Sequence, residues 1–233
     1  MEDSIKDSND KVSSPMGVND HPSIDFQIEQ ARRFHSRISE LEIMCEKDGG
    51  ALNWYPIALR TGDKKPTGWQ SWTDREVSAL SWEEVEDHIQ HNRGNYGIVA
   101  VDNLESSKEN EVTIVFVDYD VDENGRFKMP SSKVYENLRR FDTLTTKTRS
   151  GGYHQICAIN VLEKRKFYRR HGHRNFNIRH NGMDCGEVRL NNQYVVAPGS
   201  YVPVTDEKQR AGYQGMTATG YYQVEIDKPI RFI

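Results

Sequence analysis

The sequence predicts a mixed α/β (α+β) domain with antiparallel strand pairs, and three patterns along the chain indicate it. Apolar residues recur every three, four or seven positions between Ile24 and Cys45, which is typical of an amphipathic helix. The segment 112–117, VTIVFV, is continuously apolar, as expected of a strand buried on both faces. Glycine and asparagine pairs separate later strand-like segments, which favours hairpins.

Length and composition limit the class of protein. The chain has 233 residues, 36% hydrophobic and 28% charged, which suits one large domain with a buried core. It contains no run of about 18 apolar residues, so no membrane span is expected, and no secretory signal is expected at the polar N-terminus. Three irregularly spaced cysteines do not predict a disulfide framework and favour the cytoplasm.

The expected elements follow in order along the chain. Residues 1–22 are polar and aperiodic, so a disordered tail is expected there and the folded domain is expected at 23–233. The first helix is expected to begin after the N-cap Ser23 and to end at Gly49-Gly50. The other expected elements are strands at 51–59, 95–101 and 112–117, helices at 81–91 and 131–141, a hairpin of 144–149 with 153–159, and a hairpin of 187–190 with 193–197. Pro56 predicts a sheet edge or a strand end.

Two carboxylates follow the most apolar strand, in VFVDYD. Side chains alternate along a strand, so Asp118 and Asp120 share one face while Tyr119 points away. Two ionised carboxylates this close repel each other unless a cation lies between them. Hard oxygen ligands favour Mg²⁺ or Mn²⁺. An isolated Asp-x-Asp is also compatible with a solvated strand end.

A tight glycine turn lies between two of the later strands, in TRSGGYHQ. Glycine lets backbone N–H groups approach an anion closely, so Gly151 and Gly152 could hold a phosphate. Ser150 adds a hydroxyl, Arg149 adds a positive charge, and His154 can donate to a phosphate oxygen. The same pattern is compatible with an ordinary hairpin turn.

A third acid and an arginine lie further along, in GEVRLNNQYVVAPGS. Glu187 and Arg189 share a strand face, and the arginine could reach a triphosphate. The two residues are also compatible with a surface ion pair. Asp184 lies close by and is the rival third acid, but Glu187 begins the predicted strand.

The order of these motifs resembles the bifunctional primase/polymerase domain of the archaeo-eukaryotic primase superfamily. That superfamily has an acidic Asp-x-Asp or Asp-x-Glu motif, a Ser-x-His-like motif and a third acid on a later strand. The upstream Pro, Lys-Pro and Trp of the family resemble Pro56, Lys65-Pro66 and Trp69, so the resemblance spans roughly Ala51 to Val204. The third acid is more often Asp, whereas this chain has Glu187, which is one methylene longer.

The resemblance implies template-directed nucleotidyl transfer by a DNA primase, a DNA polymerase or both, using Mg²⁺ or Mn²⁺ on single-stranded DNA. It implies metal ligands at Asp118, Asp120 and Glu187, a catalytic role for His154, and nucleotide-phosphate contacts from Ser150, Gly151, Gly152, His154, Arg149, Arg189 and Lys65. Implied partners are NTP or dNTP and a replicative helicase, in trans or on a longer chain. The expected fold has two packed modules, an RRM-like antiparallel catalytic sheet and a helix–strand N-terminal module, with the active site in the cleft between them.

A basic stretch at about 161–185 separates the histidine motif from the third acid. Its segment 164–180 contains seven Lys or Arg and no acid, although the whole chain has a net charge of −4. Basic and aromatic residues in alternation suit a single-stranded template. The candidate DNA-binding residues are Lys164, Arg165, Lys166, Arg169, Arg170 and Arg174. A solvated basic helix face would give the same pattern.

Other classes of site and protein remain open on the sequence. Four donors in and after the basic stretch could bind zinc, although their spacing fits no common finger: His171, His173, His180 and Cys185. A His-x-His nickase would use His171 and His173, but Gly172 between them is a poor match and the Asp-x-Asp pair would be unexplained. A non-catalytic single-stranded DNA-binding module is the remaining alternative.

Overall fold

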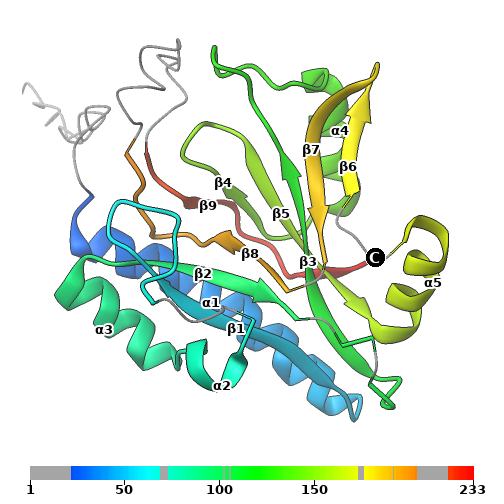
Figure 1. Ribbon diagram of the computed structural model, residues 1–233, viewed down its shortest axis with the longest axis horizontal. Coiled ribbons are helices and arrows are strands. Elements are labelled where there is room, and N and C mark those ends of the chain that lie inside the picture. Colours follow the sequence, from blue (N-terminus) through cyan, green and yellow to red (C-terminus); the bar gives the residue numbers. More distant parts are fainter. Residues whose placement is uncertain are drawn as a thin grey trace, which may run out of the picture.

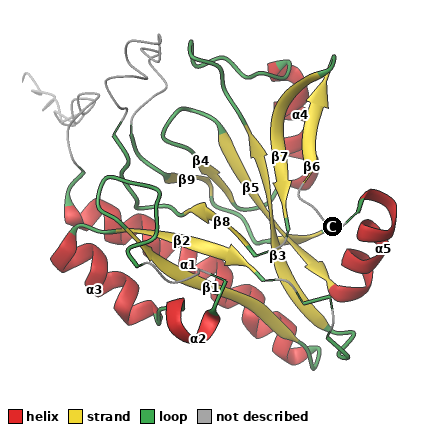
Figure 2. Ribbon diagram, viewed as in Figure 1, coloured by secondary structure: helices red, strands yellow, loops and turns green. Residues whose placement is uncertain are grey.

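The computed structural model describes residues 22–68, 73–101, 103–104, 106–172, 176–190, 192–203 and 220–233. Within these ranges the chain forms a ten-stranded mixed sheet flanked by helices, which confirms the mixed α/β class (Figures 1 and 2). The helices are α1 (Ile24–Lys47), α2 (Arg75–Ser78), α3 (Trp82–Asn92), α4 (Ser131–Phe141) and α5 (Val161–His171). The strands are β1 (Ala51–Leu59), β2 (Asn95–Ala100), β3 (Glu111–Tyr119), β4 (Thr145–Lys147), β5 (Tyr153–Asn160), β6 (Phe176–His180), β7 (Met183–Arg189), β8 (Gln193–Val196), β9 (Gln223–Ile226) and β10 (Arg231–Phe232).

Strand β3 is the point where the sheet divides into two lobes. Its residues 111–113 pair with β1, whereas residues 116–119 on the same edge pair with β7. One lobe therefore has the order β8-β2-β1, and the other consists of β3, β5, β4 and β9 with β7 and β6 beside the end of β3. In Figure 1 the first lobe runs across the picture and the second stands upright. We call the place on β3 where the partner strand changes from β1 to β7 the fork.

The first helix forms as its sequence predicts. The Ser23 hydroxyl accepts a hydrogen bond from the Phe26 amide at 3.1 Å, so Ser23 is the N-cap. The apolar stripe buries Phe34, Ile38 and Leu41 in the main core, where α1 and α3 lie against the sheet. The helix ends at Lys47, just before the two glycines that were expected to end it.

Local signals also predict α3 and α4 correctly. Ser81 and Glu84 exchange hydrogen bonds with each other's backbone amides, which is the capping box expected at the start of α3. Helix α4 spans Ser131–Phe141 as expected. The expected strands at 51–59, 95–101 and 112–117 and the hairpin on either side of the glycine turn are present as β1, β2, β3 and β4–β5. Strand β3 is buried on both faces, as its apolar run predicts.

Pro56 lies where β1 has left β3, since β1 pairs with β3 only through Ala51–Asn53. The Pro56 carbonyl accepts a hydrogen bond from the Leu80 amide at 2.9 Å, on the side away from β2. The proline nitrogen points to that same side, so no N–H of the β1–β2 ladder is lost. The expectation of a sheet edge at Pro56 is therefore confirmed at this position.

The expected hairpin of 187–190 with 193–197 is wrong. Strand β7 pairs with β3 and β6, whereas β8 crosses to the other lobe and pairs with β2. The hairpin partner of β7 is β6, through a turn at Asn181 and Gly182 with φ of 50° and 80°. Asn-Gly is a strong hairpin signal, and Asn181-Gly182 therefore explains why β7 pairs with the strand before it.

Candidate functional site

Three of the residues named as candidates form one row across the end of the sheet. Asp118 on β3 is directly opposite His154 on β5 and directly opposite Glu187 on β7. Residues in register on neighbouring strands point to the same face of a sheet. The structure therefore brings together, just beyond the fork, side chains that are 36 and 69 positions apart from Asp118 in the chain.

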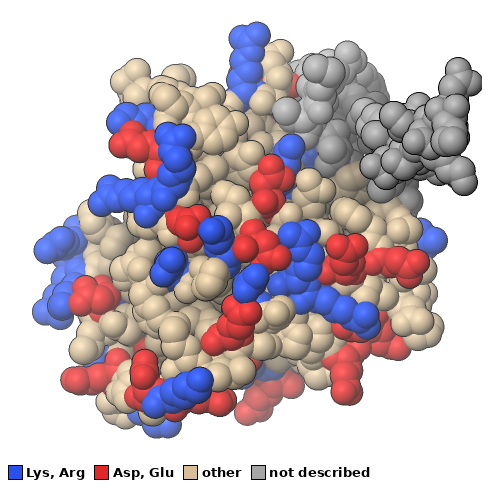
Figure 3. Space-filling view, turned by 180° about the vertical axis from the view of Figure 1, so that it is seen from behind, with Lys and Arg blue, Asp and Glu red and all other residues tan. Residues whose placement is uncertain are grey.

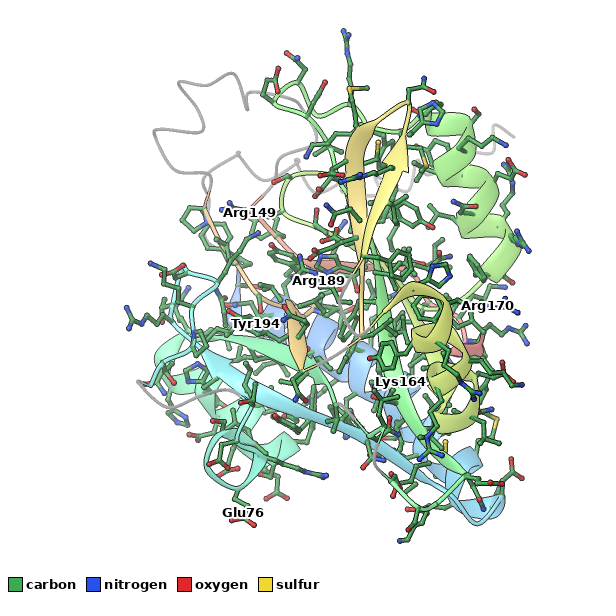
Figure 4. All side chains as sticks on the ribbon, turned by 45° about the vertical axis from the view of Figure 1, so that its right-hand side comes forward. Glu76, Arg149, Lys164, Arg170, Arg189 and Tyr194 are labelled. Carbon is green, nitrogen blue, oxygen red and sulfur yellow. The ribbon has the colours of Figure 1, made fainter. Side chains whose placement is uncertain are left out.

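Arg189 connects this row to the other lobe. Its Nη2 lies 3.1 Å from Asp118 Oδ2, its Nε pairs with the Glu187 carboxylate, and its Nη1 donates to the Tyr194 carbonyl at 3.1 Å. Tyr194 belongs to β8, and its hydroxyl donates to the Lys64 carbonyl at 2.9 Å. Figure 4 shows Arg149, Arg189 and Tyr194 gathered on the same side of the sheet. One guanidinium therefore pairs with two carboxylates and links the lobes.

Asp118 is buried among charged neighbours, with only 7% of its surface exposed. Burial raises the pKa of its carboxyl to about 7, Arg189 opposes this rise, and the nearby Asp120 and Glu187 add to it. Burial also lowers the pKa of His154 well below its ordinary value, helped by Arg189 and Lys64. His154 is therefore neutral at pH 7, with its Nε2 at 3.6 Å from Asp118 Oδ1. Within the described residues its buried Nδ1 has no hydrogen-bond partner.

This shift predicts how the stability of the metal-free chain depends on pH. Because the pKa of Asp118 is raised on folding, its contribution favours the folded state below about pH 4 and is lost as the pH rises through about 7. Over that range the stability of Asp118→Asn is expected to rise relative to that of the native chain, by a few kcal/mol in the free energy of unfolding. Thermal melts of both chains from pH 4 to 8 measure the difference. A difference that does not change with pH would contradict the prediction.

Lys64 lies beside the row, whereas the Lys-Pro resemblance pointed to its neighbour Lys65. The ammonium group of Lys64 lies 6.0 Å from the centre of the Tyr222 ring, although much of the residue is exposed. The surrounding protein, Arg149 and Arg189 lower the pKa of that ammonium. Lys65 uses its carbonyl to accept from the Arg60 amide, and its side chain is exposed. Only the turn geometry decides which of two adjacent lysines faces the row.

The remaining candidates from the Asp-x-Asp and glycine-turn motifs lie around the row. Asp120 comes just after β3, half exposed, with Oδ2 at 3.4 Å from Lys128 Nζ. Arg149 is buried, and its Nη1 donates to the carbonyl of Pro203 at 2.9 Å. Ser150 and Gly151 form the turn between β4 and β5. A Cβ on Gly152 would lie 2.3 Å from the Tyr119 carbonyl, so glycine is required there for packing.

The candidate DNA-binding residues divide into buried and exposed ones. Lys164 is fully buried and donates to the Val101 carbonyl at 2.8 Å, and Arg165 donates to the carbonyls of Leu104 and Ser106. These two side chains hold α5 to the connection after β2, so they do not form an exposed basic surface. Lys166, Arg169 and Arg170 are exposed on α5, while Arg174 lies outside the described residues.

Lys164→Ala is therefore expected to destabilise the protein, by roughly 2 to 4 kcal/mol, because it removes buried hydrogen bonds and leaves a cavity. The matched control is Lys166→Ala, two positions along the helix, where the ammonium is exposed and pairs with Glu163. That change is expected to cost less than about 1 kcal/mol. Urea denaturation measures both. Equal midpoints for the two variants would show that Lys164 has no structural role.

The four zinc candidates are not brought together in the described part of the structure. His171 packs on Phe176 at the start of β6, with ring centres 5.6 Å apart, whereas His180 is the last residue of that strand. Phe176 and His180 are four positions apart on the strand, which is roughly 13 Å. His171 and His180 therefore lie toward opposite ends of β6. Cys185 is buried, and its Sγ lies 3.2 Å from the Lys128 carbonyl. His173 lies outside the described residues.

Among the described residues, no group of three or more His, Cys, Asp or Glu side chains is arranged to hold a metal ion. At the row itself, the cation between Asp118 and Glu187 is the guanidinium of Arg189. In the same described ranges, no helix has the length and apolar character needed to cross a membrane.

Comparisons with known proteins assign no class to the chain. No family model matches it, and no curated protein matches its sequence. Its function is therefore argued from the site.

Proposed function

We propose that this chain is a metal-dependent nucleotidyltransferase that extends or primes a strand on single-stranded DNA, as a DNA primase, a DNA polymerase or both. The observation that carries the proposal is the row Glu187–Asp118–His154, in register on three neighbouring strands. Arg189 and Lys64 supply positive charge beside the row. Separate elements of the sequence thus contribute acids, a neutral imidazole and basic groups to one place.

The chemistry of the donors fits Mg²⁺ or Mn²⁺. Asp118, Asp120 and Glu187 would hold the ions, since all three offer the hard oxygen ligands that these ions prefer. Burial is the main cause of the raised pKa of Asp118, the neighbouring Asp120 and Glu187 add to it, and a divalent cation bound there would lower it. When bound, such ions lower the pKa of the attacking 3′-hydroxyl and neutralise charge on the triphosphate. Arg189 has to break its ion pair with Asp118 or with Glu187 before that carboxylate can act as a metal ligand.

The chain's own residues then have distinct parts in the proposal. Arg189, once released, would pair with the phosphates of the incoming NTP or dNTP, and Lys64 would approach them from the loop after β1. His154 is neutral, so it would orient a phosphate by a hydrogen bond instead of adding charge. The backbone of Gly151 and Gly152 lies at the same end of β5. Positioning and charge neutralisation carry most of this kind of catalysis.

A second candidate function is supported by the ion pairs of Arg189. Because that guanidinium already pairs with both Asp118 and Glu187, each of these carboxylates has a cationic partner without a metal. A non-catalytic module for single-stranded DNA would have this property. The surface seen from behind would not serve it, since Lys and Arg are interspersed there with Asp and Glu (Figure 3).

One assay separates the two functions. The purified chain is incubated with single-stranded DNA, labelled NTP or dNTP and Mg²⁺ or Mn²⁺, with and without a primer. Metal-dependent products are expected, and the lane without primer separates priming from extension. DNA binding without product, indifferent to metal and nucleotide, would support the binding module. A helicase added in trans tests the partner, and a cytoplasmic location belongs to the same proposal.

A further inference from the structure

A second hollow lies away from the row, between α5 and the ends of β2 and β3. Its volume is about 980 Å³, which is large enough for a nucleotide. It is lined by Asn53, Val101, Asn103, Leu104, Ser106, Glu111, Arg165, Tyr168, Arg169 and Asn192. The proposed chemistry at Asp118 uses none of these residues.

The wall of this hollow has the groups that recognise a nucleobase. Amide and carboxylate side chains match the donor and acceptor edges of bases, and Asn53, Asn103 and Glu111 provide them. The side chains of Asn53 and Glu111 bond each other at 3.2 Å, which fixes their orientation. The partly exposed Val101 and Leu104 offer apolar contact for the face of a base.

Asn103 is an unsatisfied donor at this wall. Lys164 fixes its side-chain oxygen at 3.3 Å, so the amide nitrogen is the group left over. That nitrogen is buried without a hydrogen-bond partner among the described residues, and the residue is only 7% exposed. A buried donor of this kind costs about 1–3 kcal/mol, which an acceptor on a ligand would recover.

Arg169 provides the charge for a phosphate at the rim. It is exposed in the last turn of α5, where its Nε donates to the Arg165 carbonyl at 3.4 Å, and it forms no ion pair within the described part of the chain. Arg165 lines the same hollow, and the carbonyls of Leu104 and Ser106 hold its guanidinium in place. Among the described residues that line the hollow, two carry a guanidinium group and one, Glu111, carries a carboxylate, and this lining favours an anion.

One wall of the hollow is connected to the row by a short stretch of chain. Asn192 is two residues before Tyr194, whose carbonyl accepts from Arg189 of the row. The far wall is more distant, since Glu111 and Asp118 are seven residues apart on β3, roughly 23 Å. Figure 4 shows Lys164 on α5 and Tyr194 on β8, to the left of that helix. A single strand of a few nucleotides would reach from the row into the hollow.

We propose that this hollow binds one unpaired nucleotide, with its base against Asn53, Asn103 and Glu111 and its phosphate at Arg169. The inference deepens the proposed function and rests on it for the identity of the strand. The nucleotide is either a residue of the single-stranded template or a free nucleoside phosphate. Both sources have the same base and phosphate chemistry, and the test distinguishes them.

The test measures binding without catalysis. A fluorescein-labelled oligothymidylate of about 12 nucleotides is titrated with the chain in the presence of a chelator, and anisotropy is recorded at several salt concentrations. Arg169→Ala is expected to weaken binding roughly tenfold and to reduce the slope of log K against log salt by about 0.7. The matched control is Arg139→Ala, since Arg139 is exposed in the last turn of α4 and is expected to have no effect.

A second variant and a second ligand complete the design. Asn103→Asp keeps an acceptor for Lys164 but replaces the donor with negative charge, so it is expected to weaken binding as well. Competition with thymidine monophosphate identifies the source, because a site for free nucleotide loses affinity for the monophosphate in both variants. The proposal is overturned if both variants bind both ligands as the native chain does, or if the native chain binds neither.

The outcome can be separated from that of the proposed function. If the native chain makes no product but Arg169→Ala still weakens binding, only the proposed function fails. If products form and Arg169→Ala binds normally, only the nucleotide site fails.

Discussion

Asp118→Ala is expected to reduce metal-dependent nucleotide addition by roughly a thousandfold or more, because it removes the central carboxylate of the row and several kcal/mol of charge stabilisation with it. The fold is expected to persist. Arg189 keeps its pair with Glu187, and a buried carboxyl with a raised pKa is lost. Product formation on primed and unprimed DNA measures the effect, and circular dichroism with a thermal melt checks the fold.

The matched control for this change is Asp184→Ala. Asp184 is an exposed acid on β7, paired with Arg179 at 2.8 Å and outside the row, and it was the rival for the third acid. Its loss is expected to leave synthesis within about twofold of native, since exposed ion pairs contribute little. A folded Asp118→Ala chain that still makes product would refute the site, and a loss confined to Asp184→Ala would favour the rival.

Gly186→Ala is expected to be among the most damaging single changes in the sheet. A Cβ at this position would lie 1.9 Å from the Asp118 carbonyl oxygen, with Gly186 at φ of 156°. Because the obstacle is backbone, β7 has to move away from β3, at a cost of about 3 kcal/mol or more. The same movement separates Glu187 from Asp118, so synthesis is expected to fall with stability. Urea denaturation and the synthesis assay measure the two effects.

Gly182→Ala is the control for the glycine change. Gly182 also has a positive φ, 80°, but no atom lies within 4 Å of the added Cβ. Only backbone strain of about 1–2 kcal/mol is therefore expected, without loss of synthesis. If the two variants lose equal stability, the close approach of β7 to β3 is not the reason that glycine is needed at position 186.

The parts of the fold that the sequence predicts are those specified by neighbouring residues. The Ser23 cap, the Ser81–Glu84 box and the apolar run of β3 each act over a few positions, so their elements were placed correctly. The partners of β7 and β8 were not, because pairing of distant strands depends on the whole sheet. β7 and β8 are neighbours in the sequence, which favours a hairpin between them. The Asn181-Gly182 turn is the local signal that favours pairing of β7 with β6 instead.

The candidate site divides in the same way. The motif order indicated Asp118, His154 and Glu187, and the strand register places them side by side. Burial could not be read from the basic stretch, so Lys164 was grouped with exposed residues although it is fully buried. The choice between Lys64 and Lys65 depends on a turn whose conformation their types do not specify. Arg189 was expected to reach phosphate or to pair with Glu187, and its additional pairing with Asp118 was not anticipated.

The fork has a consequence for the order in which the chain can fold. Strand β2 is buried along its whole length, yet its second partner, β8, begins at residue 193, more than 90 positions after β2 begins. During synthesis the edge of β2 stays unpaired until β3, β5 and β7 have been made. Contacts of such high sequence separation slow folding and expose strand edges to wrong partners. The lobe nearest the N-terminus is therefore among the last parts of the protein to be completed.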